Sequence, residues 1–344
     1  MSLGAAVPHY RDAKGGEFLV ASDHERSFGP RGVPPFLRFC MKSGAAGDLD
    51  ADLGGEAGSL LAAAELDWRV DHRPVLTELH EGIAPVQGYQ ALVRPDRGEV
   101  MGVVTSAYRV AENEKLAEAV VGLAQRHHSR AELIGAASFG RASERVLLVC
   151  RVTKLSPGEF LILLAHNRHG GEGAVRVQLV IADLAADAVL TPPARWDSYE
   201  IPHVGRMSDR LELLEGSPMI EDYLSEISGP RERLEEARWS RSRTQRLLHE
   251  LWGDPPDNEP RTKEGAPLEP DDRVKRHPAA YLSRDLDERK TAYDAFRRIC
   301  SFLDNESEAC ERGDFTKDRD ERLALGAGTK LKQKAWRWLV GAVQ

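Results

Sequence analysis

The sequence predicts an α+β fold, with a mainly antiparallel β-sheet and one packed helix, followed by a helical C-terminal region. In residues 175–181 apolar side chains alternate with Arg176 and Gln178, the period-2 pattern of a half-buried strand. The apolar run at residues 160–165 is typical of an inner strand or of a buried helix segment. Because a polar, glycine-rich turn separates the two runs, we expect a hairpin here.

Earlier segments extend this sheet. Residues 90–94 and 99–105 flank a Pro-Asp-Arg-Gly turn, which predicts another hairpin. A helix should follow with Asn113 as its N-cap, and strands should come next at residues 131–139 and 145–153. Short turns around a single helix favour an antiparallel sheet over a doubly wound parallel one.

Composition divides the chain into three regions. Residues 1–59 are rich in Gly, Pro and acidic side chains and predict a flexible arm, and residues 60–191 form the sheet domain, beginning with a short helix at 60–70. Residues 192–344 form the helical region, with a Pro- and acid-rich loop at 253–272. Its expected helices are 209–227, 231–252, 278–305 and 329–340.

Charge and hydropathy exclude several classes of protein. No apolar run approaches the roughly 20 residues of a membrane helix, and the N-terminus lacks a basic start followed by an apolar block, so we expect a cytoplasmic protein. The formal net charge of -8 argues against a globally basic nucleic-acid binder. Residues 89–182 nevertheless contain twelve Lys/Arg and nine Asp/Glu, so the sheet is less acidic than the rest.

No catalytic, metal or cofactor motif is present. The four cysteines form no CxxC pair, and Cys150 is expected to be a small buried hydrophobe. His166, His169 and Glu172 would supply metal ligands, but no further ligand is identifiable, so we expect a polar turn and no metal. Residues 326–334 lack the Gly-Lys-Ser/Thr order of a phosphate loop.

Basic residues give the clearest functional hypothesis, a contact with phosphates. The candidates are Arg141 and Arg145 at one turn, Arg168 and Arg176 at the next, and Lys330, Lys332, Lys334, Arg337 and Trp336 on the last helix. The alternative for that helix is docking through Leu331, Ala335, Trp338 and Leu339, with its lysines solvated.

Four segments together resemble a phage/plasmid-like family of proteins of uncharacterised function. They are ALVRPDRGEVMGVV with YRVAEN at Tyr108–Asn113, LLAHNRHGGEGAVRV at Leu163–Val177, IPHVG around His203, and TAYDAFRRICSFLDNE with GAGTKLKQKAWRWL near the C-terminus. The family usually carries Ser and Asp in the turn after Asn167, and Cys and Asn near Ile181 and Asp183, so this chain departs from it there. In outline the family is similar to phage single-strand annealing proteins, a fold-level analogy.

The resemblance and the charge contrast lead to one principal hypothesis, a non-enzymatic mobile-element protein that binds nucleic acid, single-stranded DNA in particular, and that forms a homo-oligomer. An assembly component of a phage or plasmid system without DNA affinity is the first alternative. A hydrolase or nuclease with a site assembled from distant residues is the second, for which Glu132, Glu144, Glu159 and Asp183 stand near predicted strand ends.

Overall fold

A computed structural model describes most of the sheet domain and the helices. The described residues are 9–11, 17–21, 57–63, 66–80, 82–139, 142–171, 173–183, 188–195, 197–253, 278–305 and 328–343. Most of the expected N-terminal arm at residues 1–59 and nearly all of the loop at 253–272 therefore lie outside the described residues.

The chain forms two compact units that are interleaved in sequence. Unit 1 comprises Met1–Gly29, Pro34–Ala182 and Trp196–Asp222. Unit 2 comprises Pro30–Val33, Asp183–Arg195 and Tyr223–Gln344.

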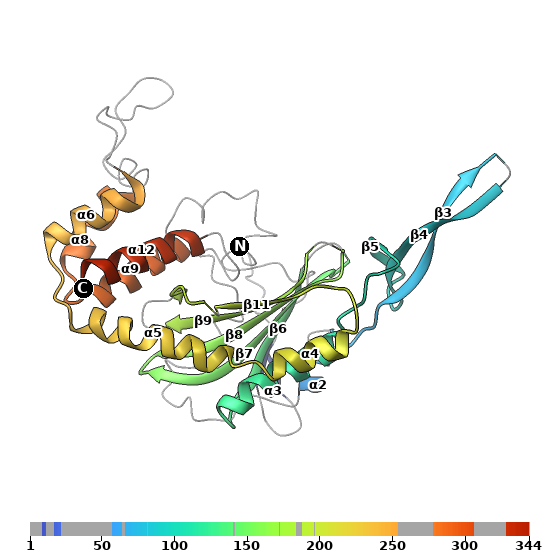
Figure 1. The fold of residues 1–344 in the computed structure, drawn as a ribbon, viewed down its shortest axis with the longest axis horizontal. Coiled ribbons are helices and arrows are strands. Elements are labelled where there is room, and N and C mark those ends of the chain that lie inside the picture. Colours follow the sequence, from blue (N-terminus) through green and yellow to red (C-terminus); the bar gives the residue numbers. More distant parts are fainter. Residues whose placement is uncertain are drawn as a thin grey trace, which may run out of the picture. The chain divides into compact units, whose positions relative to one another are not determined.

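A large sheet organises unit 1, and its path runs β1-β2-β6-β7-β8-β9, with β11 also pairing with β9. Figure 1 labels β6, β7, β8, β9 and β11 of this sheet. The strands are β1 (His9–Arg11), β2 (Glu17–Ala21), β6 (Glu132–Phe139), β7 (Arg145–Ser156), β8 (Glu159–Arg168), β9 (Val175–Asp183) and β11 (Ser198–Ile201). The β2–β6 pair is parallel, whereas β1–β2, β6–β7, β7–β8 and β9–β11 are antiparallel. The predicted α+β class with a mainly antiparallel sheet is confirmed.

The helix α3 (Asn113–His127) covers this sheet, packing on β6, β7 and β8. Its buried face includes Leu116, Val120 and Leu123 at helical spacing. The helices α2 (Ala57–Ala63) and α4 (Met207–Glu215) pack against α3 in turn. The single packed helix of the prediction is thus present, with two further helices beside it.

A second, three-stranded antiparallel sheet, which we call the arm, consists of β3 (Asp71–Leu79), β4 (Gly82–Arg94) and β5 (Glu99–Thr105). Strand β5 pairs only with residues 89–94 of β4, so β3 and β4 continue beyond it as a two-stranded hairpin (Figure 1). The β4–β5 hairpin is confirmed with its predicted turn. Strand β3 was not predicted, because its Pro74, His72 and Arg73 break the alternation of a strand.

Unit 2 is helical, with one short strand. Its elements are β10 (Ala188–Leu190), α6 (Arg241–Trp252), α8 (Pro278–Asp287), α9 (Ala292–Asn305) and α12 (Thr329–Ala342), together with most of α5 (Met219–Glu236). The helix α9 packs against β10, α8 and α12, and α6 packs against α8 and α12. No helix in the described part of the chain is long and apolar enough to span a bilayer.

Several predicted helix boundaries are wrong. The helix α5 runs through Gly229 and Pro230, where a break was expected, while residues 278–305 form two helices that separate at 288–291. Residues 66–70 are not helical. Packing of apolar side chains overrides the local preference of Gly and Pro at such positions.

Candidate functional site

Three arginines lie at one end of the large sheet. Arg145 begins β7 and is the direct cross-strand neighbour of Arg168, the last residue of β8. Arg176 is the second residue of β9, and the six-residue link between β8 and β9 requires an antiparallel pair, which brings it to the same end. We call these three residues the arginine end; Arg141, predicted to join them, lies outside the described residues.

Like charges directly opposite each other on neighbouring strands repel. Arg145 and Arg168 are two like charges directly opposite each other on β7 and β8, and both are half-buried. Arg176 is half-buried as well. Across β11, the neighbour of Arg176 is the exposed acidic residue Glu200. The arginine end therefore brings three arginines to one end of the sheet, with one acidic residue opposite Arg176.

The arm fixes the turn beside these arginines. A Cβ on Gly102 of β5 would lie 2.3 Å from the carbonyl oxygen of Gly170, and one on Gly171 would lie 2.6 Å from Cγ1 of Val104. The hydroxyl of Tyr108 donates to the carbonyl oxygen of Arg168 at 3.1 Å. These backbone and hydroxyl contacts hold the turn after Arg168 against β5 and against Tyr108, which follows β5. We call this part of the arm its root.

A buried polar cluster underlies this turn. The amide Nδ2 of Asn113 donates to the Leu66 carbonyl at 3.0 Å, and that of Asn167 donates to the Ala111 carbonyl at 2.8 Å. These bonds set the orientation of both amides, so Nε2 of His169 lies 3.0 Å from Oδ1 of Asn113 and 3.1 Å from Nδ2 of Asn167. The cluster ties the start of α3 to the end of β8.

His203 joins the cluster from the segment before α4. Its Nδ1 donates to the Arg109 carbonyl at 2.9 Å, and its ring stacks on Tyr108 with centroids 4.5 Å apart. Among the described residues, Nδ1 of His169 and Nε2 of His203 have no hydrogen-bond partner. Both rings are therefore held in the neutral form.

Burial sets the ionisation of these two imidazoles. It lowers the pKa of His169 to about 3, and the proximity of His203 adds to the effect. Burial also lowers the pKa of His203, against the hydrogen bond to Arg109, which favours the protonated form. Neutral, buried rings of this kind stabilise the junction and are shielded from solvent.

The sequence assigned His166, Asn167 and His169 only to a polar turn, and it did not connect them with Tyr108, Asn113 or His203. The structure brings together three of the four segments on which the family resemblance rests. The only hint in the sequence that these residues lie together is that all of them fall within segments of the family resemblance. They stand up to 95 positions apart and share no local spacing.

Within the described part of the chain, no group of three or more His, Cys, Asp or Glu is placed to hold a metal ion. Glu172, a candidate ligand, lies outside it. Cys150 and Cys300 are free and fully buried, and burial raises the pKa of both thiols. The interpretation of Cys150 as a buried hydrophobe is confirmed.

The expectation of a basic aromatic surface on α12 is wrong for two of its residues. Lys332 is 1% exposed, and its Nζ lies 2.6 Å both from Oδ1 of Asp304 and from the Val189 carbonyl oxygen. Trp336 is buried edge-to-face against Phe296. Because the carboxylate of Asp304 neutralises Lys332, this lysine occupies a core position of the helix.

The remaining basic residues of α12 differ in their contacts. Lys334 forms an ion pair of 3.0 Å with Glu250. Lys330 and Arg337 are exposed. The docking face of the helix consists of Lys332, Ala335, Trp336 and Leu339, so it is shifted from the expected face.

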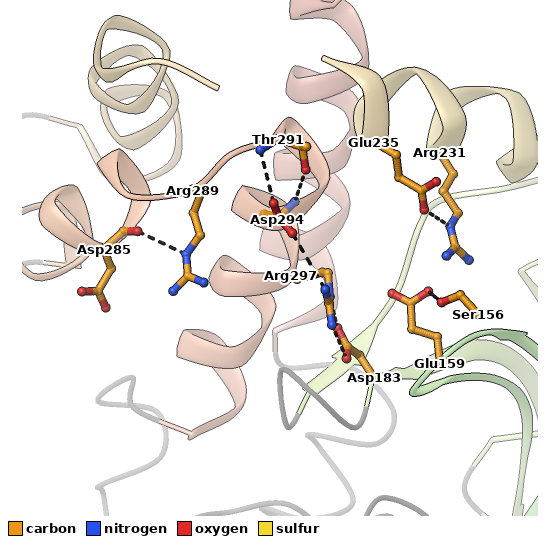
Figure 2. A network of polar contacts seen from close by, with 10 residues as sticks. All are labelled: Ser156, Glu159, Asp183, Arg231, Glu235, Asp285, Arg289, Thr291, Asp294 and Arg297. Atoms are coloured by element: carbon orange, nitrogen blue, oxygen red, sulfur yellow. Dashed lines mark hydrogen bonds and ion pairs between the residues drawn. The ribbon is translucent and has the colours of Figure 1, made fainter. Parts of the chain in front are cut away.

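The four acidic residues of the hydrolase alternative have separate local partners. Glu132 pairs with Arg151, and Glu144 accepts from the Ala142 amide at 3.0 Å. Glu159 accepts from the Ser156 hydroxyl at 2.8 Å, and in unit 2 Asp183 forms a bidentate ion pair with Arg297 (Figure 2). Each of the four carboxylates thus has a partner of its own among the described residues.

Comparison with known protein families gives a match over much of the chain. A family model described as a domain of unknown function (DUF932) matches residues 100–326. No curated protein and no solved structure matches the chain. The matched range contains the arginine end and, apart from Leu66, all the residues named in the buried polar cluster.

Proposed function

The chain belongs to the DUF932 family, a domain of unknown function, and we propose that this member is a non-enzymatic, nucleic-acid-binding protein of a phage or plasmid. The observation that carries the proposal is the arginine end: Arg145 and Arg168 face each other across β7 and β8, and Arg176 begins the adjoining strand. Closely spaced guanidinium groups suit the phosphates of a nucleic-acid backbone, because each presents a planar fork of donors.

Single-stranded DNA is the proposed ligand. The similarity in outline to phage single-strand annealing proteins supports it, as does the mobile-element context of the family resemblance. The contact would be to the backbone, so it would be largely independent of base sequence. Buried Lys332 and Trp336 play no part in it.

Fluorescence anisotropy of labelled single-stranded and duplex oligonucleotides, measured at several salt concentrations, tests the proposal. We expect salt-dependent binding that favours the single strand. The variants Arg168→Ala and Arg176→Ala should each weaken binding and flatten the log-log salt slope by about 0.7 to 1.

Arg130→Ala is the matched control, since Arg130 is exposed and precedes β6, whose first residue pairs with Arg151, well along β7 from Arg145. It removes the same charge without touching the arginine end. Absence of binding at the lowest salt, or equal losses in all three variants, would contradict the proposal.

The second candidate is an assembly component of a phage or plasmid system without DNA affinity. The exposed apolar side chains of the arm favour it, because contiguous apolar surface marks sites of protein interaction. A protein without nucleic-acid affinity that nevertheless forms a defined complex would place this candidate first.

A further inference from the structure

The arm is apolar on both of its faces. Leu92, Met101 and Val104 are buried on the inner face. On the opposite face, Tyr89, Val100 and Val103 are 53%, 59% and 55% exposed, and Ala91 and Val93 lie beside them in the register of β4 and β5. An antiparallel sheet with one solvated face ordinarily carries polar residues there.

Exposed apolar side chains also continue along the β3–β4 hairpin, at Leu76, Leu79 and Ile83. Of the eight large hydrophobic residues that are exposed in the described part of the chain, six belong to the arm. A two-stranded hairpin is marginally stable in water on its own. This concentration indicates a surface that another polypeptide covers.

We propose that the outer face of the arm, consisting of Tyr89, Ala91, Val93, Val100 and Val103, binds the same face of a second copy of this chain. The proposal concerns self-association and does not depend on nucleic-acid binding.

The charges on the outer face of the arm favour a second copy of this chain as its binding partner. The outer face also carries Asp71 and Arg73, which are exposed and form an ion pair of 2.9 Å. In a two-fold dimer, Asp71 of one copy would therefore face Arg73 of the other, and the reverse. The apolar residues of β4 and β5 would meet beside these pairs. Residues 71–105 contain three Lys/Arg and five Asp/Glu, a net charge of -2, which disfavours a nucleic acid or an anionic membrane.

The face of the sheet, and not its edge, suits this contact. Strand β3 pairs only with β4 among the described strands, but it carries Pro74 and a register irregularity between Pro74 and Leu76. Proline and irregular pairing both oppose the addition of a further strand. Stacking of two sheet faces needs no free backbone groups.

The test uses two double variants of the full chain, in which Val100→Lys and Val103→Lys make the outer face basic, or Val100→Glu and Val103→Glu make it acidic. Analytical ultracentrifugation should show that the wild type associates with increasing concentration. Each double variant alone should associate at least about tenfold more weakly, because like charges meet across the interface. An equimolar mixture of the two should recover a complex of two chains.

Leu213→Lys is the matched control, because Leu213 is a 65% exposed leucine on α4 and should leave association unchanged. Circular dichroism establishes that each variant is folded. The proposal is overturned if the wild type is monomeric at every accessible concentration. The outer face of the arm would then be a surface for a different protein. The proposal is equally overturned if the double variants associate like the wild type, or if mixing them restores nothing.

Discussion

Ionisable side chains in the interior of this protein are accommodated in two ways. Lys332 has both a carboxylate and a carbonyl oxygen within 2.6 Å, so its charge is compensated. His169 is fully buried with no acidic partner among the described residues, and it is held neutral, with its pKa lowered to about 3. Unfolding therefore exposes a group that gains a proton at mildly acidic pH.

This difference predicts a pH-dependent stability. Between the folded pKa of His169 and the ordinary histidine value near 6.5, the unfolded chain binds a proton that the folded chain does not. The free energy of unfolding should therefore fall as the pH falls through this window, by about 1.4 kcal/mol per pH unit for one histidine. His169→Gln, which keeps an amide near Asn113, should lose that share of the slope.

Urea denaturation of the wild type and of His169→Gln at pH 7, 6, 5 and 4 measures the two slopes. The difference in stability between the proteins should shrink steadily as the pH falls, because only the wild type gains the proton on unfolding. Two parallel curves would show that His169 is not held neutral by the fold.

At the scale of elements, β5 of the arm and the turn after β8 are held together by the close approach of their backbones at Gly102 and Gly170. Gly102→Ala would place its Cβ 2.3 Å from the Gly170 carbonyl oxygen, a contact that a backbone group can relieve only by moving. The expected destabilisation is about 1–3 kcal/mol, measured by urea denaturation. If the arginine end binds single-stranded DNA as proposed, the affinity for DNA should fall as well, because the displaced turn follows Arg168 directly.

Gly58→Ala is the control for this prediction. Gly58 lies in α2, and a Cβ added there would have no neighbouring atom within 4 Å, so alanine should stabilise the helix by about 0.5–1 kcal/mol. If Gly102→Ala were as stable as the wild type, the turn at Gly170 would not be fixed by β5.

The elements show what the sequence could predict. Strand β9 has regular alternation and was predicted at residues 175–181, close to its observed bounds, because burial itself produces the pattern. The apolar run at residues 160–165 lies within β8, which continues to Arg168, so His166 and Asn167 belong to the strand and not to the turn. The strand β3 was missed because its sequence does not alternate and its extended form depends on pairing with β4. The continuity of α5 through Pro230 was missed because proline locally predicts a helix break. The predicted basic face of α12 failed at Lys332, whose role depends on Asp304, 28 residues away.

The candidate site was predictable only in part. The arginine end follows from sequence, because Arg145, Arg168 and Arg176 stand at strand ends next to turns. The buried polar cluster does not, since Asn113 and His203 approach His169 through chain connections that no periodicity records.

At the scale of the whole molecule, each unit is assembled from separate parts of the chain. Unit 2 requires Asp183–Arg195, which precedes the return of the chain to unit 1 at Trp196–Asp222. The described contacts that hold this segment include the Asp183–Arg297 ion pair, the hydrogen bonds of Val189 with Asp304 and Lys332, and the hydrogen bond from the Arg195 amide to Glu226. A cut at residue 222 therefore does not yield a complete unit.

A fragment of residues 223–344 should accordingly be less stable than the same fragment supplied with a peptide of residues 183–195. Without the peptide, Asp304 loses the Val189 amide at 2.8 Å and Lys332 loses the Val189 carbonyl at 2.6 Å. Each of these hydrogen bonds involves a charged group, which makes it worth about 1.5–3 kcal/mol. Thermal unfolding followed by circular dichroism should show a higher transition temperature with the peptide, and a Val189→Pro peptide, which lacks the amide that Asp304 accepts from, should give a smaller rise. Equal transition temperatures with and without the wild-type peptide would show that the helices of unit 2 fold independently of β10.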